Sequence, residues 1–172
     1  AAECKILGYK DEAGKLLHLF KPNNDITRKE LLVMLVKCRY GEQDAVTIKP
    51  FPDVEVNDFA ASAIAYGKKA GIVEGFDDGT FKPNKKASRA EALKMILLTW
   101  KTLEEIKKAA PNNSCTDLGI ATAWYIPYFN YALNNGNISG YKNTDGSLNG
   151  MCKPNQSITR GETAKMIVGV KQ

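Results

Sequence analysis

Residues 82–91 read KPNKKASRAE, and the same pattern occurs at residues 21–30 (KPNNDITRKE) and 153–162 (KPNQSITRGE). The spacing from proline to arginine is identical in all three copies. A recurrence with fixed spacing indicates one structural unit used three times. Whatever chemistry the unit carries is therefore expected three times as well.

The sequence upstream of each pattern sets the boundaries of the units. Copies two and three begin with the related segments FPDV (51–54) and CTDL (115–118), and copy one has no such segment. We expect one domain over residues 1–172, made of repeat one at 1–40 (partial), repeat two at 51–110 and repeat three at 115–172. The segment PNNS at 111–114 is the clearest linker.

Each unit is expected to fold as helix, loop and helix. Apolar residues at helical spacing predict first helices over 58–69, with a cap at Asn57 or Asp58, and over 121–135. Gly71 and Gly136 should end these two helices. The predicted fold class is therefore all-α.

The second helix of each unit begins at a capping box. The N-cap residues are Thr27, Ser88 and Thr159, and the glutamates at N3 are Glu30, Glu91 and Glu162. Residues 97–108 are expected to prolong this helix in copy two. The methionines that recur inside these helices, Met34, Met95 and Met166, are interpreted as core residues.

The charge pattern excludes several classes of protein. The chain has 24 Lys and Arg and 19 Asp and Glu, for a net charge of +5, and the two signs are interspersed. This pattern argues against a dedicated nucleic-acid binder and permits an anionic partner of another kind. No apolar stretch approaches the length that crosses a bilayer, so we expect no membrane insertion.

The four cysteines are placed informatively within the repeats. Cys115 stands where copy two has Phe51, and Cys152 stands where copy two has Phe81. If the two phenylalanines touch, their counterparts should be close enough for a Cys115–Cys152 disulfide, which leaves Cys4–Cys38 as the second bridge. Bridges would indicate an oxidising compartment, whereas buried free thiols are the alternative.

The arginine after each cap, Arg28, Arg89 or Arg160, is the main candidate for binding chemistry. A cation at a helix N-terminus opposes the helix dipole unless an anion lies nearby. Two readings stay open: each arginine pairs with an acidic residue of a neighbouring unit such as Asp53 or Asp117, or it binds a carboxylate of a ligand.

Other chemistry finds little support in the sequence. His18 is the only histidine, which makes an acid–base triad hard to build, and it is expected in an exposed loop. Asp77-Asp78-Gly79 lacks the ligand ladder of a calcium loop and is interpreted as a turn. We predict no enzyme activity, no metal site and no cofactor.

The ordered motifs of copy two resemble the S-layer homology repeat. They are FPDV, then Phe59-Ala60 with Ile64, then GIVEGFDDGTFKP (71–83) and SRAE (88–91). Copy three resembles this repeat from Cys115 to Val168, and copy one only from about Gly8 to Val36. The resemblance implies a three-pronged helical domain with three repeats around a pseudo-threefold axis.

The resemblance also implies a function and a site. Members of the family anchor surface proteins to the bacterial cell envelope without a covalent link, by binding wall polymers in grooves between repeats. The ligand arginine of the family maps to Arg28, Arg89 and Arg160. Other residues expected to line the grooves are Asp53, Asp117, Gly75, Gly79, Gly140 and Gly146, with Phe59 and Trp124 as the aromatic wall. Each groove is expected to offer an arginine, a helix N-terminus and an aromatic wall to an acidic sugar.

Three departures from the family pattern limit this transfer. Copy one lacks the first helix, so either one groove is incomplete or residues outside this chain complete it. Phe59 stands where the family often has tryptophan, and paired cysteines replace core phenylalanines.

The expected partner is an acidic secondary wall polysaccharide carrying ketal-linked pyruvate, or peptidoglycan itself.

The expected location is extracellular, at the cell surface or wall, or on the periplasmic face of the envelope. The alternative function is a protein–protein interaction module of a surface lattice or filament, with contacts to surface-layer proteins. The incomplete first unit keeps this alternative open.

Overall fold

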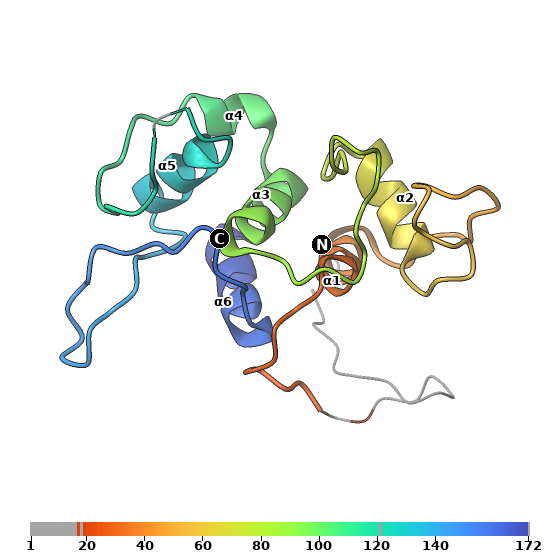
Figure 1. Cartoon of the computed structure of the whole chain (residues 1–172), viewed down its shortest axis with the longest axis horizontal. Coiled ribbons are helices and arrows are strands. Elements are labelled where there is room, and N and C mark those ends of the chain that lie inside the picture. The colour runs from red at the N-terminus through yellow and green to blue at the C-terminus, as the bar shows by residue number, and fades with distance from the viewer. Residues whose placement is uncertain (1–16, 18, 121, 172) are drawn as a thin grey trace.

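The computed structural model describes residues 17, 19–120 and 122–171 of the chain. Six helices occur within these residues (Figure 1): α1 (Arg28–Tyr40), α2 (Ala61–Lys69), α3 (Arg89–Trp100), α4 (Leu103–Lys107), α5 (Ile126–Asn134) and α6 (Arg160–Lys171). Pairing of extended segments in the described part is limited to isolated bridges. The predicted all-α class is confirmed.

The capping boxes start the second helices where the sequence predicts. The hydroxyl of Thr27 accepts a hydrogen bond from the Glu30 amide, and the Glu30 carboxylate accepts one from the Thr27 amide, at the start of α1. The box of Ser88 opens α3 in the same way. At α6, the Glu162 carboxylate accepts the Thr159 amide at 2.9 Å. Both partners of these capping hydrogen bonds lie close together along the chain, which is why the sequence predicts the three starts.

The first helices are shorter than predicted at their N-termini. Helix α2 begins at Ala61 and not at 58, because the Asp58 carboxylate accepts the amide of Ala60 and holds residues 58–60 in a turn. Helix α5 begins at Ile126, with a proline in its first turn. The predicted glycine ends are confirmed by left-handed φ values of 71° at Gly71 and 66° at Gly136.

The predicted prolongation of the second helix of copy two to residue 108 is wrong. Helix α3 ends at Trp100, and Thr102 and Glu105 form a further capping box that opens the separate helix α4. A capping box inside an apolar run starts a new helix because the cap residue must leave helical geometry.

The segments that lead into α1, α3 and α6 bond to one another in a closed ring. The amides of three aligned residues each donate to the carbonyl of another copy: Ile26 to Ile158 (3.0 Å), Ile158 to Ala87 (3.1 Å) and Ala87 to Ile26 (2.9 Å). Each of these three residues is fully buried. The three copies therefore contact one another through equivalent residues, and the pseudo-threefold arrangement of the whole repeats stays a prediction.

The helices pack around this ring. Helix α1 packs on α2 and α3, α3 packs on α5 and α6, and α4 packs on α5. Figure 1 shows α1, α3 and α6 towards the centre of the molecule, with α2 and α5 on its two sides. Leu35 in α1, Ile96 in α3 and Ile167 in α6 are aligned residues near the middle of their helices. All three are buried and belong to one core.

One aligned position shows that α6 differs from α1 and α3. Val36 in α1 and Leu97 in α3 are fully buried, whereas Val168 in α6 is 55% exposed. Helix α2 covers this side of α1, where Gly67 faces the side chain of Leu32, one turn before Val36. Helix α6 packs mainly on α3. The side of α6 that carries Val168 is therefore less covered than the equivalent sides of α1 and α3, and the incompleteness of copy one stays a prediction.

The Cys115–Cys152 disulfide predicted from the internal alignment is confirmed, with a Cα–Cα distance of 5.6 Å. In copy two, the rings of Phe51 and Phe81 lie in contact with centroids 5.5 Å apart, as that alignment assumed. Cys38 is also disulfide-bonded. Its expected partner, Cys4, and the single histidine, His18, lie outside the described residues.

Candidate functional site

Two equivalent grooves lie between the copies, each with an arginine of one copy facing the loop and second helix of the next. The Arg28 groove has a volume of about 390 Å³ and is lined by Arg28, Ile72, Val73, Glu74, Gly75, Phe76, Asp77, Glu91, Lys94, Met95 and Trp124. The Arg89 groove has a volume of about 240 Å³ and is lined by Arg89, Asn137, Ile138, Ser139, Gly140, Tyr141, Lys142, Glu162, Lys165 and Met166. These names are kept below.

The three arginines are buried at the contacts between copies. Arg28, Arg89 and Arg160 are 5%, 7% and 5% exposed. The Nε of Arg28 donates to the carbonyl of Phe81, and the Nε of Arg160 donates to the carbonyl of Phe20, each at 2.9 Å. Both guanidinium groups therefore hold two copies together.

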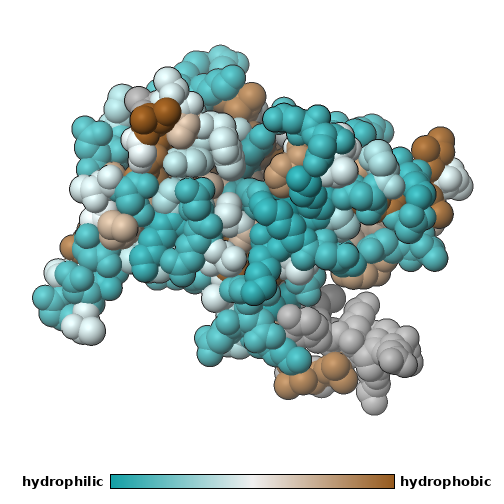
Figure 2. Space-filling view, in the orientation of Figure 1, coloured by the Kyte–Doolittle hydropathy of each residue, from teal (hydrophilic) through white to brown (hydrophobic). Residues whose placement is uncertain are grey.

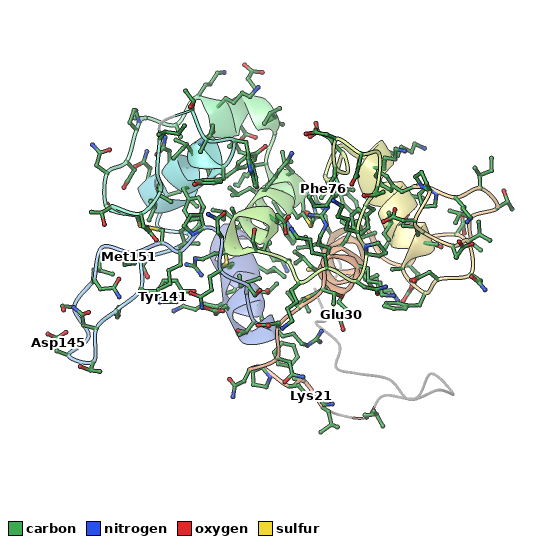
Figure 3. The ribbon with its side chains drawn as sticks, viewed as in Figure 1. Lys21, Glu30, Phe76, Tyr141, Asp145 and Met151 are labelled. Atoms are coloured by element: carbon green, nitrogen blue, oxygen red, sulfur yellow. A yellow bond between two sulfur atoms is a disulfide. The ribbon has the colours of Figure 1, made fainter. Side chains whose placement is uncertain are left out.

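The guanidinium groups also stack on aromatic rings of the next copy. The Cζ of Arg28 lies 4.6 Å from the ring centroid of Phe76, and that of Arg89 lies 5.0 Å from the ring of Tyr141. Figure 3 labels these two aromatic residues. A cation over a ring face is stabilised by the quadrupole of the ring. Each groove thus has a wall in which one arginine is stacked on one aromatic ring.

The predicted ion pair between arginine and aspartate takes a different form. Arg28 Nη1 lies 3.6 Å from the carboxylate of Glu91, the capping-box residue of copy two. Burial lowers the pKa of the Arg28 guanidinium, and the nearby carboxylates of Glu91 and Asp53 offset part of this effect. The glutamates predicted as structural caps therefore also face the arginine in the groove.

The helix N-termini are not open to a ligand, so this part of the expected site is wrong. The first amide of each helix donates to a loop carbonyl of the next copy, from Arg28 to Lys85 (2.9 Å), from Arg89 to Gln156 (2.8 Å) and from Arg160 to Asn24 (2.9 Å). The second amides donate in the same cyclic order to the carbonyls of the three repeat prolines. The third amides donate to the cap hydroxyls, so the first three backbone amides of α1, α3 and α6 are not available to an anion.

Asp53 and Asp117 bind backbone amides of their own copy. The two carboxylate oxygens of Asp53 accept the amides of Phe81 and Lys82 at 2.9 and 2.7 Å. Asp117 accepts the equivalent amides of Cys152 and Lys153, each at 2.7 Å. The three aligned lysines Lys21, Lys82 and Lys153 have left-handed φ values of 50° to 56°. The aspartates thus stabilise a strained loop, and their contact with a glycan stays a prediction.

Of the four predicted glycines, Gly75 and Gly140 line the grooves, whereas Gly79 and Gly146 are not among the lining residues. A Cβ at Gly75 would lie 2.6 Å from the ring of Phe51, so close packing requires glycine there. Gly146 follows Asp145, which lies at the outer tip of its loop in Figure 3, away from the helices.

The two predicted wall aromatics are both exposed, and they differ in position. Trp124 is 51% exposed and lines the Arg28 groove, where Lys94 lies 5.9 Å from its ring. Phe59 is 66% exposed and lines neither of the two described grooves; its ring is 4.9 Å from Lys29. The turn before α5 in copy three therefore contributes a wall, through Trp124, to a groove formed by the two preceding copies.

Lys94 and Lys165 are among the lining residues that the sequence reasoning missed. Lys94 and Lys165 stand five residues after Arg89 and Arg160 and line the two grooves. The internal alignment holds this signal, because the two lysines occupy the same register. Copy one has Val33 at this position, which hides the recurrence.

The Asp-rich turn is a turn stabilised by its own side chain, as interpreted from the sequence. The Asp78 carboxylate accepts the amide and the hydroxyl of Thr80 at 3.0 and 2.5 Å. These hydrogen bonds, the hydroxyl of Thr80 first, lower the pKa of Asp78 to about 2. Within the described part of the chain, no group of three or more metal-ligating side chains occurs.

The helices of the described region are too short or too polar to traverse a bilayer. The face of the molecule shown in Figure 2 is largely hydrophilic, with small separate hydrophobic patches.

The comparisons with known proteins decide the family. Residues 50–93 match the model of the S-layer homology domain. The chain contains an S-layer homology domain. The match begins just before Phe51 and ends within α3, so it contains the whole loop that lines the Arg28 groove.

Relatives of this S-layer homology domain carry cell-surface names. The chain is 32% identical to the cellulosome-anchoring protein of Acetivibrio thermocellus over 87% of this chain and 32% of that protein. It is 29% identical to cell surface glycoprotein 1 of the same organism (86% and 6%) and 31% identical to the middle cell wall protein of Brevibacillus brevis (72% and 12%). The chain thus spans a third or less of the length of these relatives.

Proposed function

We propose that this S-layer homology domain attaches its protein to the cell envelope by binding an anionic wall glycan in the grooves between repeats. The proposed role is non-enzymatic, and the proposed location is the outer face of the envelope. The observation that carries the proposal is the recurring groove in which a buried arginine, an aromatic ring and a half-buried glutamate of two different copies meet.

The chemistry of the groove suits an acidic sugar. A guanidinium binds a carboxylate through charge-assisted hydrogen bonds, and burial strengthens them because the local dielectric is low. Phe76 and Tyr141 offer a flat apolar face to the ring of a sugar. Ketal-linked pyruvate on a secondary wall polysaccharide is one suitable source of the carboxylate, and the peptide stems of peptidoglycan are another.

Several weak grooves on one domain add to the strength of attachment. If one polymer, or several adjacent chains of a wall, engages more than one groove, the second contact forms at high effective concentration. The names of the relatives, which include a cellulosome-anchoring protein and a cell wall protein, support a role in attachment.

Co-sedimentation with cell-wall sacculi tests the proposal. The domain should pellet with sacculi that retain their acidic polymers and stay in solution with sacculi stripped of them. The double variant Arg89→Ala/Arg160→Ala should lose this binding with an unchanged helical circular dichroism spectrum. Both arginines also stabilise contacts between copies, so their loss could affect the fold. The double variant Arg89→Lys/Arg160→Lys is therefore the matched control, because lysine keeps the positive charge but cannot form the two parallel hydrogen bonds of a guanidinium to a carboxylate.

Two results would contradict the proposal. One is equal pelleting of the stripped and unstripped sacculi; the other is full binding by a folded arginine double variant. Retention by a purified surface-layer protein, without retention by sacculi, would instead favour a role in a protein lattice.

A further inference from the structure

The two described grooves share their architecture but differ in their balance of charge. The Arg28 groove is lined by two cations, Arg28 and Lys94, and three carboxylates, Glu74, Asp77 and Glu91. The Arg89 groove is lined by three cations and one carboxylate, namely Arg89, Lys142, Lys165 and Glu162. The difference arises at two aligned positions, where Ser139 replaces Glu74 and Lys142 replaces Asp77.

The cations of the Arg28 groove are paired within the protein. Lys94 Nζ lies 2.9 Å from Glu74 Oε2, and this hydrogen bond lowers the pKa of the Glu74 carboxyl, which stays ionised beside the lysine. Arg28 donates through Nε to the carbonyl of Phe81 and lies 3.6 Å from Glu91. An anionic ligand would have to displace carboxylates that the groove already contains.

Two of the three cations of the Arg89 groove, both lysines, are not neutralised in this way. Lys142 and Lys165 are both exposed, and they belong to none of the ion pairs among the described residues. The one carboxylate, Glu162, already accepts hydrogen bonds from the hydroxyl of Tyr141 at 2.9 Å and from the amide of Thr159 at 2.9 Å.

Arg89 itself has an unused donor. Its Nε is buried and has no hydrogen-bond partner in the described part of the chain, whereas the Nε atoms of Arg28 and Arg160 each donate to a carbonyl. Its Nη2 makes one long bond, of 3.3 Å, to the carbonyl of Ser139. A buried N–H without a partner is unfavourable, and a ligand oxygen that accepts it removes this cost.

We propose that the Arg89 groove is the principal site of this domain for a carboxylate-bearing sugar. The guanidinium of Arg89 binds the carboxylate, Lys142 and Lys165 attract it from the rim, and the ring of Tyr141 forms the wall. Glu74 and Asp77 keep the Arg28 groove from the same role by neutralising it. This inference rests on the proposed function, because it names the groove and the charges through which the wall glycan is recognised.

A titration with a defined carboxylate probe tests the site directly. We expect trigalacturonate, added to the 15N-labelled domain, to shift the Arg89 Nε–H signal and the amides of residues 139–142. The Arg28 Nε–H signal and the amides of residues 74–77 should move much less. Trigalacturonate with its carboxyl groups reduced to alcohols should leave all of these signals in place. Equal shifts in both grooves, larger shifts in the Arg28 groove, or no shift at all would overturn the inference.

A charge exchange between the grooves provides the second test, by co-sedimentation with sacculi that retain their polymers. Lys142→Ala/Lys165→Ala should weaken binding about tenfold, because two rim charges are lost. Glu74→Ser/Asp77→Lys gives the Arg28 groove the charges of its counterpart and should tighten binding about threefold to tenfold, because a second groove then contributes.

A matched control separates these effects from net charge. Lys69→Ala/Lys108→Ala removes two exposed lysines that line neither groove and should bind as the parent does. Parent protein that shifts with trigalacturonate but fails to pellet with sacculi would refute the wall-binding role and support the anion site. Pelleting that is unaffected by the Lys142 and Lys165 changes would refute the groove assignment and leave the wall-binding role standing.

Discussion

The same substitution, Val→Ala, at two aligned positions should have very different effects on the stability of this domain. Val36 in α1 is fully buried and Val168 in α6 is 55% exposed, although both stand eight residues after the capping-box arginine. The change removes two methyl groups, which are worth about 1.6 kcal/mol of transfer free energy when fully buried. At Val36 a cavity of up to two methyl groups adds up to about 1 kcal/mol more.

The expected costs are therefore about 2–3 kcal/mol for Val36→Ala and about 0.7 kcal/mol or less for Val168→Ala, because less than half of the Val168 side chain is shielded from water. The loss at Val36 corresponds to a fall in Tm of about 4–12 °C for a domain of this size. Urea unfolding, followed by circular dichroism, measures both free energies of unfolding, and the slope m should stay constant.

Leu97→Ala is the third member of the series and should behave like Val36→Ala. Leu97 is fully buried in α3, and the loss of a buried leucine side chain costs about 2–5 kcal/mol. Equal losses of about 2 kcal/mol or more at Val36 and Val168 would refute the reasoning. Such a result would mean that this side of α6 is covered in solution and that the three copies are equivalent there.

Two further predictions concern the loop between the helices. Gly75→Ala should destabilise the domain by about 2–4 kcal/mol, because the new Cβ would lie 2.6 Å from the ring of Phe51 at a φ of 88°. Gly79→Ala should cost only about 1 kcal/mol, because Gly79 has a φ of 77° but nothing within 4 Å of the new Cβ. Equal losses of stability in thermal unfolding would argue against the packing role of Gly75. The Asp78 carboxyl should titrate with a pKa of about 2 in 13C NMR spectra. Its contribution to folding stability is therefore present above pH 3.8, the ordinary pKa of the group, and is lost as the pH falls through 2. Thr80→Val should return the pKa of Asp78 towards 3.8, and an unchanged pKa in this variant would exclude the hydroxyl as the main cause.

The sequence predicts well the features that depend on neighbours along the chain. Capping boxes fix the starts of α1, α3 and α6 because both partners of each hydrogen bond lie within four residues. The Cys115–Cys152 bridge is predictable because the repeats provide an internal alignment in which Phe51 and Phe81 are the equivalent pair. The same alignment holds the recurrence of Lys94 and Lys165.

The features that the sequence does not reveal depend on contacts between copies. The amide of Arg28 donates to the carbonyl of Lys85, which is 57 residues away along the chain, and no local pattern marks the two as partners. The sequence predicts the start of α2 three residues too early, because the Asp58 side chain closes a turn with Ala60 where the sequence is equally compatible with a helix. The net charge of a groove also depends on two copies, because the paired residues Arg28 and Glu91 belong to different repeats.

A structural contact of the arginine and the proposed binding of a ligand are not exclusive, because the contact with the next copy uses the Nε and leaves other atoms of the guanidinium facing the groove. In Arg28 the Nε donates to a carbonyl of the next copy, while the same residue also lines a groove with its remaining surface. A groove therefore forms only when two copies are in contact, since one supplies the arginine and the other supplies the aromatic ring and the glutamate. Any ligand that binds there binds the folded array and not the unfolded chain, and its binding free energy adds to the stability of the contact between copies. In Arg89 the Nε, which could strengthen this contact, has no partner within the described residues, and under our proposal the carboxylate of the ligand supplies the missing acceptor.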